Sequence, residues 1–184
     1  MNAKGLTVFY KLLNLYEKSG KAQYTIGEPL TILEHSIECA RFQLKTNNSS
    51  AIVSALLHDI GHLAPVIPID PNTGIDDQHE RVGANMLAEM GFNEDVFIPV
   101  RNHVNAKRYL CYKKVGYYEG LSAGSIASLK IQGGIMHKEE AELFEKSKWF
   151  TESINLRYAD EAAKTTSDPP MRFLDFKEYI LNVM

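Results

Sequence analysis

The sequence predicts an all-α fold in one domain that spans residues 1–184, and three observations predict it. Apolar residues recur three or four positions apart in one segment after another, which is the spacing of a helix face. No stretch of the sequence alternates apolar and polar residues over a useful length of strand, and none repeats internally. A chain of 184 residues can bury a substantial core and is short enough for a single domain.

The first half of the chain contains three predicted helices separated by turn-forming residues. Helical spacing covers residues 6–18 and stops before the Ser-Gly pair at 19–20. A loop over 21–29 precedes a second helix over about 30–45, and the Asn-Asn-Ser-Ser turn at 47–50 supplies an N-cap for a central helix over 51–57. Residues 63–74 contain three prolines and no helical period, which predicts a long loop of the kind that often carries function.

The second half is predicted to be helical with short connections. Glycines at 91 and at 133–134 end two of the expected helices. The predicted helices cover residues 79–90, 94–109, 122–132, 138–146, 152–164 and 172–183. Together with the first three they would form a helical bundle.

The composition is that of a globular protein of the cytoplasm. Hydrophobic residues make up 45% and charged residues 23% of the chain, and the net charge of −3 gives no basic field for nucleic acid. Cys39 and Cys111 lack metal or redox spacing and fit reduced thiols, with a single disulfide as the alternative. The N-terminus does not resemble a signal peptide, and no run approaches the roughly 20 apolar residues of a membrane helix. We therefore expect a cytoplasmic protein without a membrane, nucleic-acid or obligate protein partner.

The segment 57–62 (Leu-His-Asp-Ile-Gly-His) is the strongest chemical signal in the sequence. It closes the apolar central helix, so His58 and Asp59 are expected in a buried setting, where unpaired polar groups are costly. A metal would satisfy both, since the two oxygens of Asp59 can bridge two cations while His58 binds one of them. Gly61 would let the chain turn sharply before His62. The alternative is an ordinary helix C-terminus, where the helix dipole stabilises a histidine and a glycine ends the helix.

Five of the six histidines stand at positions compatible with a ligand set spread over four helices. They are His35, His58, His62, His79 and His103. Imidazole and carboxylate ligands suit iron, zinc, manganese or nickel better than calcium, and the absence of a cysteine cluster argues against structural zinc. The sixth, His137, follows two glycines and is expected on the surface.

Two of the later helices place a cation beside a candidate metal ligand. His103 and Lys107 share one face, either as a metal ligand beside an anion-binding ammonium or as a solvated basic turn. Arg157 and Asp160 also share a face, either as an ordinary ion pair or as an oxyanion ligand beside a metal ligand. Both pairs therefore have a structural and a chemical interpretation.

A third helix carries a polar stripe of neutral residues. Ser125, Ser128 and Gln132 recur at helical spacing with little charge around them, either as a solvated face or as the lining of a ligand site. Together with Lys107 and Arg157, the stripe would make a pocket for a small tetrahedral anion.

The order of the candidate ligands is similar to that of a known family. A histidine, a His-Asp pair, two histidines and an aspartate follow one another at His35, His58, Asp59, His79, His103 and Asp160. This order resembles the HD-domain superfamily of metal enzymes, which implies an HD-type helical bundle, and the two additional histidines resemble its dinuclear members. Further residues between 24 and 160 resemble the mixed-valent diiron oxygenases that cleave organophosphonates, and these are Tyr24, Glu28, His62, Lys107, Ser125, Ser128, Gln132 and Arg157.

The resemblance implies a role for each of these residues. One iron would be held by His35, His58, Asp59, Asp160 and, before substrate binds, Tyr24. The second iron would be held by Asp59, His79 and His103, with Asp59 as the bridge. Tyr24, Glu28 and Asp59 would be the catalytic residues, and Glu28 would also meet the substrate amine. The phosphonate would contact His62, Lys107, Ser125, Ser128, Gln132 and Arg157.

The resemblance also implies a reaction. It is that of an iron-dependent dioxygenase of organophosphonate catabolism, with a mixed-valent Fe(II)/Fe(III) pair as cofactor and a small organophosphonate and O2 as partners. The expected reaction is oxidative cleavage of the C–P bond of 2-amino-1-hydroxyethylphosphonate to glycine and phosphate. The carboxylate of Glu28 favours this primary amine over a quaternary ammonium, which prefers an aromatic or neutral lining.

Three alternatives remain at the level of sequence. The same chemistry could act on an N-methylated 1-hydroxyphosphonate. An HD-domain metal-dependent phosphohydrolase would use the same ligands to activate water and would have no need of Tyr24 and Glu28. A non-catalytic metal-binding module would leave the anion-binding residues unexplained.

Overall fold

The computed structural model describes residues 2–23, 30–64 and 76–184. This part of the chain contains nine α-helices and three short 3-10 helices, and no β-strand beyond an isolated bridge between Gln23 and Thr31. The all-α prediction is confirmed. The α-helices are α1 (Ala3–Ser19), α2 (Ile32–Gln43), α3 (Ser49–Leu57), α4 (His79–Met90), α5 (Glu94–Lys113), α6 (Ala123–Ile131), α7 (Lys138–Glu145), α8 (Phe150–Ala162) and α9 (Lys177–Asn182). The 3-10 helices are η1 (Leu44–Thr46), η2 (Ile60–Leu63) and η3 (Phe173–Phe176). None of the described helices is both long enough and apolar enough to cross a membrane.

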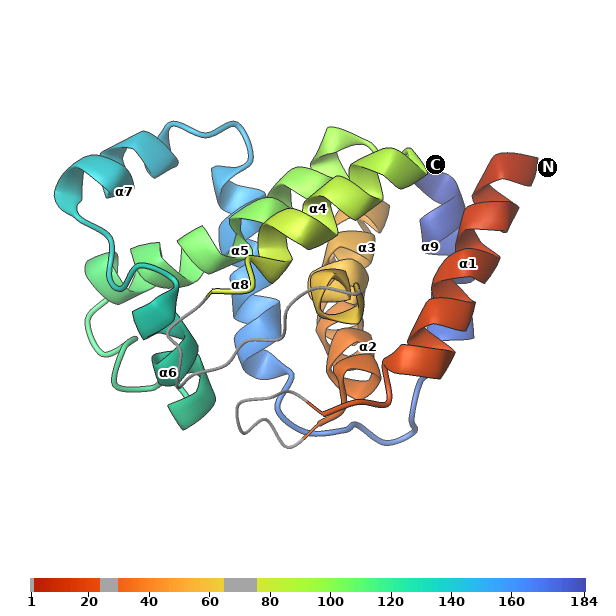
Figure 1. Cartoon of the computed structure of the whole chain (residues 1–184), viewed down its shortest axis with the longest axis horizontal. Coiled ribbons are helices and arrows are strands. Elements are labelled where there is room, and N and C mark those ends of the chain that lie inside the picture. Colours follow the sequence, from red (N-terminus) through yellow and green to blue (C-terminus); the bar gives the residue numbers. More distant parts are fainter. Residues whose placement is uncertain (1, 24–29, 65–75) are drawn as a thin grey trace.

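Helix α3 is surrounded by the other helices of the bundle. It packs against α2, α5, α8 and α9, and Figure 1 shows α1 and α9 at one end of the molecule and α6 and α7 at the other. Ile52, Leu56 and Leu57 of α3 are fully buried in the main hydrophobic core. His58 and Asp59, which follow α3, therefore lie in the interior, as the apolar run of the sequence predicts.

Local sequence signals start the two central helices. Thr31 Oγ1 accepts a hydrogen bond from the Glu34 N–H at 3.2 Å, and Glu34 Oε2 accepts one from the Thr31 N–H at 2.9 Å, which completes a capping box at α2. The side chain of Asn48 accepts from the N–H groups of Ser50 and Ala51 at 2.9 and 3.2 Å. This is the N-cap of the central helix that the sequence predicts.

A proline inside α5 is compensated by a side chain of α3. Pro99 has no N–H to donate to the Asp95 carbonyl, which lies four residues earlier in the helix. The hydroxyl of Ser54 lies 3.0 Å from the Val96 carbonyl and 3.4 Å from the Asp95 carbonyl, and 2.7 Å from the Ser50 carbonyl of its own helix. The backbone carbonyls of Asp95 and Val96 thus contact the Ser54 side chain of α3.

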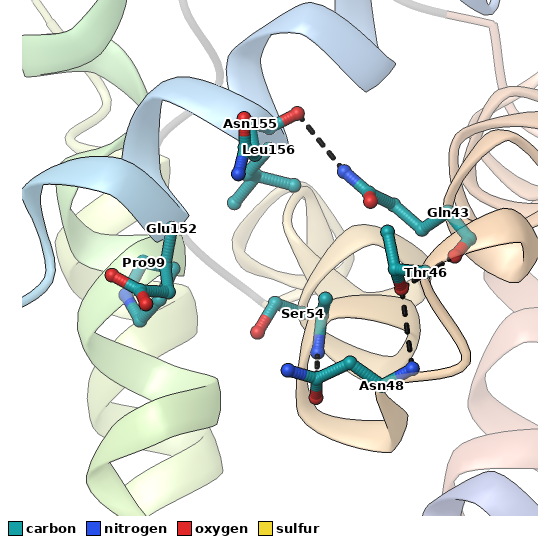
Figure 2. Close-up of a pocket in the computed structure, with 9 residues that line it drawn as sticks. Gln43, Thr46, Asn48, Ser54, Pro99, Glu152, Asn155 and Leu156 are labelled. Atoms are coloured by element: carbon teal, nitrogen blue, oxygen red, sulfur yellow. Dashed lines mark hydrogen bonds between the residues drawn. The ribbon is translucent and has the colours of Figure 1, made fainter.

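A small cavity of about 180 Å³ lies beside this contact (Figure 2). Its lining comes from the N-terminal end of α3 and from neighbouring segments, and consists of Gln43, Thr46, Asn48, Ala51, Ser54, Pro99, Glu152, Asn155 and Leu156. Figure 2 shows Gln43 reaching toward Asn155, where its Nε2 donates to the backbone carbonyl at 2.9 Å. Because His58 and Asp59 follow the opposite end of α3, this cavity is separate from the histidine cluster.

Most predicted helix boundaries differ from the structure by one to three residues, and two helices differ more. The helix predicted over 94–109 continues to Lys113, since Leu110 is buried in a second apolar cluster that α5 shares with α6 and α7. The helix predicted over 172–183 is divided into η3 and α9. Phe173 and Phe176 are both buried at a spacing of three residues, which a 3-10 turn places on one side.

Gly61 is required by a close approach of two segments. The sequence suggests that it permits a sharp turn, but the positive φ values of the described glycines belong to four other positions. An ideal Cβ at Gly61 would lie 2.0 Å from the carbonyl oxygen of His79, at the first residue of α4. Gly83 of α4 also faces this segment, and its Cβ would lie 3.0 Å from the Gly61 nitrogen. The missing side chains let η2 and α4 touch, which places His62 beside His79.

Gly61→Ala is expected to destabilise the fold, because backbone atoms of α4 must move to admit the methyl group. We expect a loss of about 1–3 kcal/mol in the free energy of unfolding, as for other overpacked sites. Chemical denaturation monitored by circular dichroism measures it. Gly120→Ala is the matched control, since its Cβ would lie 3.5 Å from the nearest atom. An equal loss in both variants would contradict the close-approach explanation.

Candidate metal centre

Asp59 directs its two carboxylate oxygens to different histidines. The residue follows His58 directly after α3, and both side chains are buried. Its Oδ2 lies 3.2 Å from His58 Nε2, whereas its Oδ1 lies 3.7 Å from the Nε2 atoms of both His79 and His103. A carboxylate in this position can bridge two cations, as the sequence predicts for Asp59.

The first group of potential ligands gathers residues from α2, α8 and the end of α3. His35 Nε2 lies 3.1 Å from Asp160 Oδ1, and ligand atoms of these two residues, His58 and Cys39 all lie within 4.8 Å of one another. All four residues are buried. The structure therefore brings together three predicted ligands of the first iron, with the thiol of Cys39 as an unpredicted neighbour.

The second group joins the end of α3 to α4 and α5. His79 Nε2 lies 3.1 Å from His103 Nε2, and both atoms face Asp59. Ligand atoms of the three residues lie within 4.8 Å of one another, and all three are buried. These are the residues predicted to hold the second iron.

The hydrogen bonds of the four histidines fit metal binding. Each imidazole has its Nδ1 atom beside an acceptor at 2.7–2.9 Å, namely the carbonyls of Ala163, Ala55 and Val100 and the carboxylate of Asp77. A neutral imidazole that donates through Nδ1 keeps a lone pair on Nε2, which is the usual state of a metal-bound histidine.

The Nε2 atoms confirm that the donor set suits a cation. Within the described residues, the buried Nε2 of His58 has no hydrogen-bond partner of suitable geometry. The facing Nε2 atoms of His79 and His103 cannot bond to each other when both carry lone pairs. A metal ion in each group satisfies these atoms.

The charges of the cluster keep its carboxylates ionised. Burial raises the pKa values of Asp59 and Asp160, but the neighbouring positive charges and hydrogen bonds together outweigh it, led by His58 at Asp59 and by Arg157 at Asp160. Both pKa values therefore lie well below their usual range. Burial lowers the pKa of His58, yet the adjacent Asp59 carboxylate raises it to about 9. Burial holds the pKa of His103 well below its usual range. Ionised carboxylates beside these rings form a site for positive charge.

A buried lysine beyond the cluster donates hydrogen bonds to residues of the predicted polar stripe. Lys107 lies one turn beyond His103 on α5, and its Nζ donates to Ser128 Oγ at 2.8 Å and to Gln132 Oε1 at 2.5 Å. Burial and the charge of Arg157 lower the pKa of Lys107 to about 7. Ser128 and Gln132 of the predicted polar stripe thus face a cation inside the protein. The solvated-face interpretation of the stripe is wrong for these two residues.

Arg157 contacts the predicted metal ligand Asp160, and its charge acts on Lys107. It is buried on α8, and its Nε donates to the Tyr117 hydroxyl at 2.9 Å. Its two terminal nitrogens donate to the carboxylates of Asp160 and Glu161. Three of the five N–H bonds of the guanidinium are used in this way, which leaves two for a ligand.

His62 and Ser125 lie at the edges of the site. The ring of His62 stacks on that of His79 at 4.0 Å, and its Nδ1 lies 3.0 Å from Asp77 Oδ2. Ser125 is buried at the start of α6, where its backbone N–H is capped by Ser122. The predicted site residues Tyr24 and Glu28 lie outside the residues that the structure describes.

The structure adds three residues next to the predicted site that the sequence did not indicate: Asp77, Tyr117 and Cys39. Cys39 stands four residues after His35, on the same face of α2, so helical spacing could have found it. Asp77 and Tyr117 lie in connecting segments and carry no such signal. His137 is exposed, as predicted.

Comparisons with known proteins agree with this arrangement. The family model described as HD domain matches residues 32–143. The chain is 41% identical over 152 residues to the [1-hydroxy-2-(trimethylamino)ethyl]phosphonate dioxygenase (glycine-betaine-forming) of Leisingera caerulea, which covers 82% of this chain and 76% of the relative. It is 37% identical over 172 residues to the hydroxymethylphosphonate dioxygenase of Gimesia maris, which covers 91% of this chain and 82% of the relative. An uncharacterised protein of Acanthamoeba polyphaga mimivirus is 38% identical over 163 residues, covering 85% and 72%.

The two phosphonate dioxygenases match 82% and 91% of the chain. The HD-domain model begins at the start of α2 and ends within α7, so it contains the predicted ligands from His35 to His103. The chain therefore belongs to the HD-domain family, and within it to the group of phosphonate dioxygenases that two of these relatives represent.

Proposed function

We propose that this protein is a diiron oxygenase that cleaves the C–P bond of a 1-hydroxyphosphonate. One observation supports the proposal above all others: Asp59 turns its two oxygens toward two groups of buried imidazoles, and a buried lysine and arginine lie beside them. The relatives named as phosphonate dioxygenases support the same class of reaction.

In this proposal the two irons form a mixed-valent Fe(II)/Fe(III) pair. The first would be held by His35, His58, Asp59, Asp160 and Tyr24, and the second by Asp59, His79 and His103. Bound iron would supply the one-electron chemistry with O2 that cleaves the C–P bond. The hydrogen bonds at the Nδ1 atoms hold the imidazoles so that their Nε2 atoms face the metals.

The protein would bind the phosphonate through cationic and polar side chains that lie near the metal ligands. Lys107 uses two of its three N–H bonds on Ser128 and Gln132, so one remains for a phosphonate oxygen. Arg157 has two N–H bonds available, and His62 and Ser125 complete the proposed contacts. Two buried cations close together favour an anion between them, because it offsets their mutual repulsion.

The proposed substrate is 2-amino-1-hydroxyethylphosphonate, with glycine and phosphate as products. Glu28 supports a primary ammonium group, although the relatives are named for a trimethylamino and a hydroxymethyl compound. The second candidate is therefore the N-trimethylated phosphonate. Comparing kcat/KM for the three compounds decides between them, and a preference for the trimethylated compound would remove Glu28 from amine recognition.

We also propose a cytoplasmic location and a single domain over residues 1–184. Both cysteines are free thiols, with Cys39 buried and Cys111 partly buried. Free thiols fit a reducing compartment. The first and last helices, α1 and α9, pack against each other, which supports one folding unit.

The deciding experiment measures oxygen uptake and phosphate release together. Protein loaded anaerobically with ferrous iron is given 2-amino-1-hydroxyethylphosphonate and then air. We expect about one phosphate for each O2 consumed, because the four electrons that O2 accepts convert C1 of the substrate to a carboxylate. Hydrolysis of phosphate esters without oxygen, together with no uptake on the phosphonate, would assign the protein to the phosphohydrolases instead.

The activity is expected to fall as pH rises above about 7, the pKa of Lys107 in the free protein. The sign follows from the ligand: a protonated ammonium binds the phosphonate, and deprotonation at higher pH removes the charge. The pH profile of kcat/KM reports groups of the free enzyme and the free substrate. Comparison with Lys107→Met separates the lysine from the titration of the substrate. A profile that is unchanged in this variant would assign the fall in activity to another group.

A further inference from the structure

The carboxylate of Asp77 contacts two histidines, His62 and His79, beside the second group of potential ligands. Asp77 lies two residues before the start of α4, and its Oδ2 is 3.0 Å from Nδ1 of His62. Its Oδ1 is 2.9 Å from Nδ1 of His79 and accepts from the His79 backbone N–H at 3.2 Å. Each oxygen of the carboxylate therefore serves a different imidazole.

The contacts with Asp77 determine which nitrogen carries the proton in the imidazoles of His62 and His79. An ionised carboxylate only accepts hydrogen bonds, so both Nδ1 atoms must carry the proton. The rings of His62 and His79 are stacked at 4.0 Å with an interplanar angle of 18°, so both turn the same edge toward Asp77. The Nε2 atom of His79 then faces Asp59 and His103.

We propose that Asp77 is a positioning residue that sets the Nδ1–H tautomer and the orientation of both His62 and His79. The inference rests on the proposed function, in which His79 binds a metal and His62 contacts the phosphonate. Asp77 thereby connects substrate binding to the second metal group through one side chain. Gly61 contributes to the arrangement, since its close approach to the His79 backbone places His62 beside that residue.

A carboxylate is needed at this position because two donors require two acceptors. The amide of an asparagine offers a single oxygen, and its nitrogen would face the Nδ1 proton of one ring. Since Oδ1 serves both N–H groups of His79, the amide nitrogen of Asp77→Asn is expected to face His62, while loss of the negative charge weakens the bond to His79. Asp76→Asn is the matched control, because the Asp76 carboxylate caps the Gln78 backbone N–H at 3.2 Å.

The first test locates the ring protons by long-range 1H–15N NMR on zinc-loaded protein, which is diamagnetic. Wild-type protein is expected to show the Nδ1–H tautomer at His62, and Asp77→Asn is expected to lose it while Asp76→Asn retains it. A wild-type His62 that carries its proton on Nε2 alone would overturn the inference. This observation needs no variant, so a failure of Asp77→Asn to fold does not prevent the test.

The second test measures the affinity of the second metal group by competition with a chelator. Loss of a partner to a metal-bound histidine typically weakens metal binding by about 10- to 100-fold, and we expect this range for Asp77→Asn. Asp77→Glu, which keeps both acceptor oxygens, should recover most of the affinity. Equal affinities in wild type and Asp77→Asn would contradict the role assigned to Asp77 at His79.

A third test uses kinetics to separate the two histidines. Asp77→Asn is expected to raise KM in the wild-type background and not in a His62→Ala background, where the substrate contact is already absent. An equal rise in both backgrounds would exclude action through His62. The NMR and metal measurements do not require turnover. Absence of phosphonate cleavage in wild-type protein would therefore count against the proposed function alone.

Discussion

Asp59→Asn is expected to abolish the oxygenase activity and to remove metal from both groups. Asp59 is the residue whose two oxygens face the two imidazole groups, at 3.2 Å from His58 Nε2 and 3.7 Å from the Nε2 atoms of His79 and His103. The amide has nearly the same shape, but its nitrogen has no lone pair for a metal and its charge is zero. We expect kcat to fall on the order of a thousandfold or more, as when a central catalytic group is removed.

Metal analysis of the purified variants checks this prediction together with oxygen uptake. Wild-type protein is expected to bind about two irons per chain and Asp59→Asn about one or fewer, since both groups lose a ligand. Asp175→Asn is the matched control, because Asp175 is exposed and pairs with Arg172 at 2.9 Å rather than with a histidine of the cluster. Two tightly bound irons in Asp59→Asn would show that the carboxylate is not the bridge. His79→Ala should lose metal from one group only, and this difference separates a bridging ligand from a terminal one.

The parts of the site that the sequence could predict are those encoded by short spacings. His58 and Asp59 are adjacent and follow an apolar run, so their burial at one point follows from the helix alone. Lys107 stands one turn after His103, and Asp160 nearly one turn after Arg157, so each pair had to share a face. The resemblance to the family then joined these local pairs into one set, which spacing by itself could not do.

The remaining parts of the site depend on contacts between distant segments. Asp77 is 15 residues from His62, and only the packing of η2 on α4 brings the two together. Tyr117 is 40 residues from Arg157 in the sequence and lies in the connection between α5 and α6. Neither residue has a periodic pattern, because connecting segments follow turn geometry rather than a helix face. Such partners of functional residues become visible only in a folded structure.

The fold, like the site, has features that depend on neighbouring residues in the sequence and others that depend on contacts between distant segments. Helix positions could be predicted because apolar spacing and caps are local, as the capping box at Thr31 and Glu34 illustrates. A proline at position 99 ordinarily argues against a continuous helix, yet α5 runs through it. Ser54 of α3 lies 3.4 Å from the Asp95 carbonyl, which Pro99 leaves without its helical donor. A sequence pattern for α5 alone contains no sign of that partner.

Lys107→Met is expected to weaken phosphonate binding strongly while leaving the metal content unchanged. Methionine keeps much of the length and the apolar stem of the lysine but removes the charge. Hydrogen bonds to a charged group contribute about 1.5–3 kcal/mol, so KM should rise roughly 10- to 150-fold. The Nζ of Lys107 donates to Ser128 of α6 at 2.8 Å and to Gln132, which follows α6, at 2.5 Å, so the lysine is not placed as a metal ligand.

Steady-state kinetics and iron analysis on the same samples test whether Lys107 binds the phosphonate without holding the metal. Lys130→Met is the matched control, since Lys130 is exposed near the end of the same helix α6 that Lys107 contacts. The control should keep the KM of the wild-type protein, and both variants should keep their iron. Thermal unfolding accompanies the assay, because Gln132 loses a buried partner in Lys107→Met. Loss of iron in proportion to activity, with KM unchanged, would mean that Lys107 supports the metal centre and that the anion is bound elsewhere.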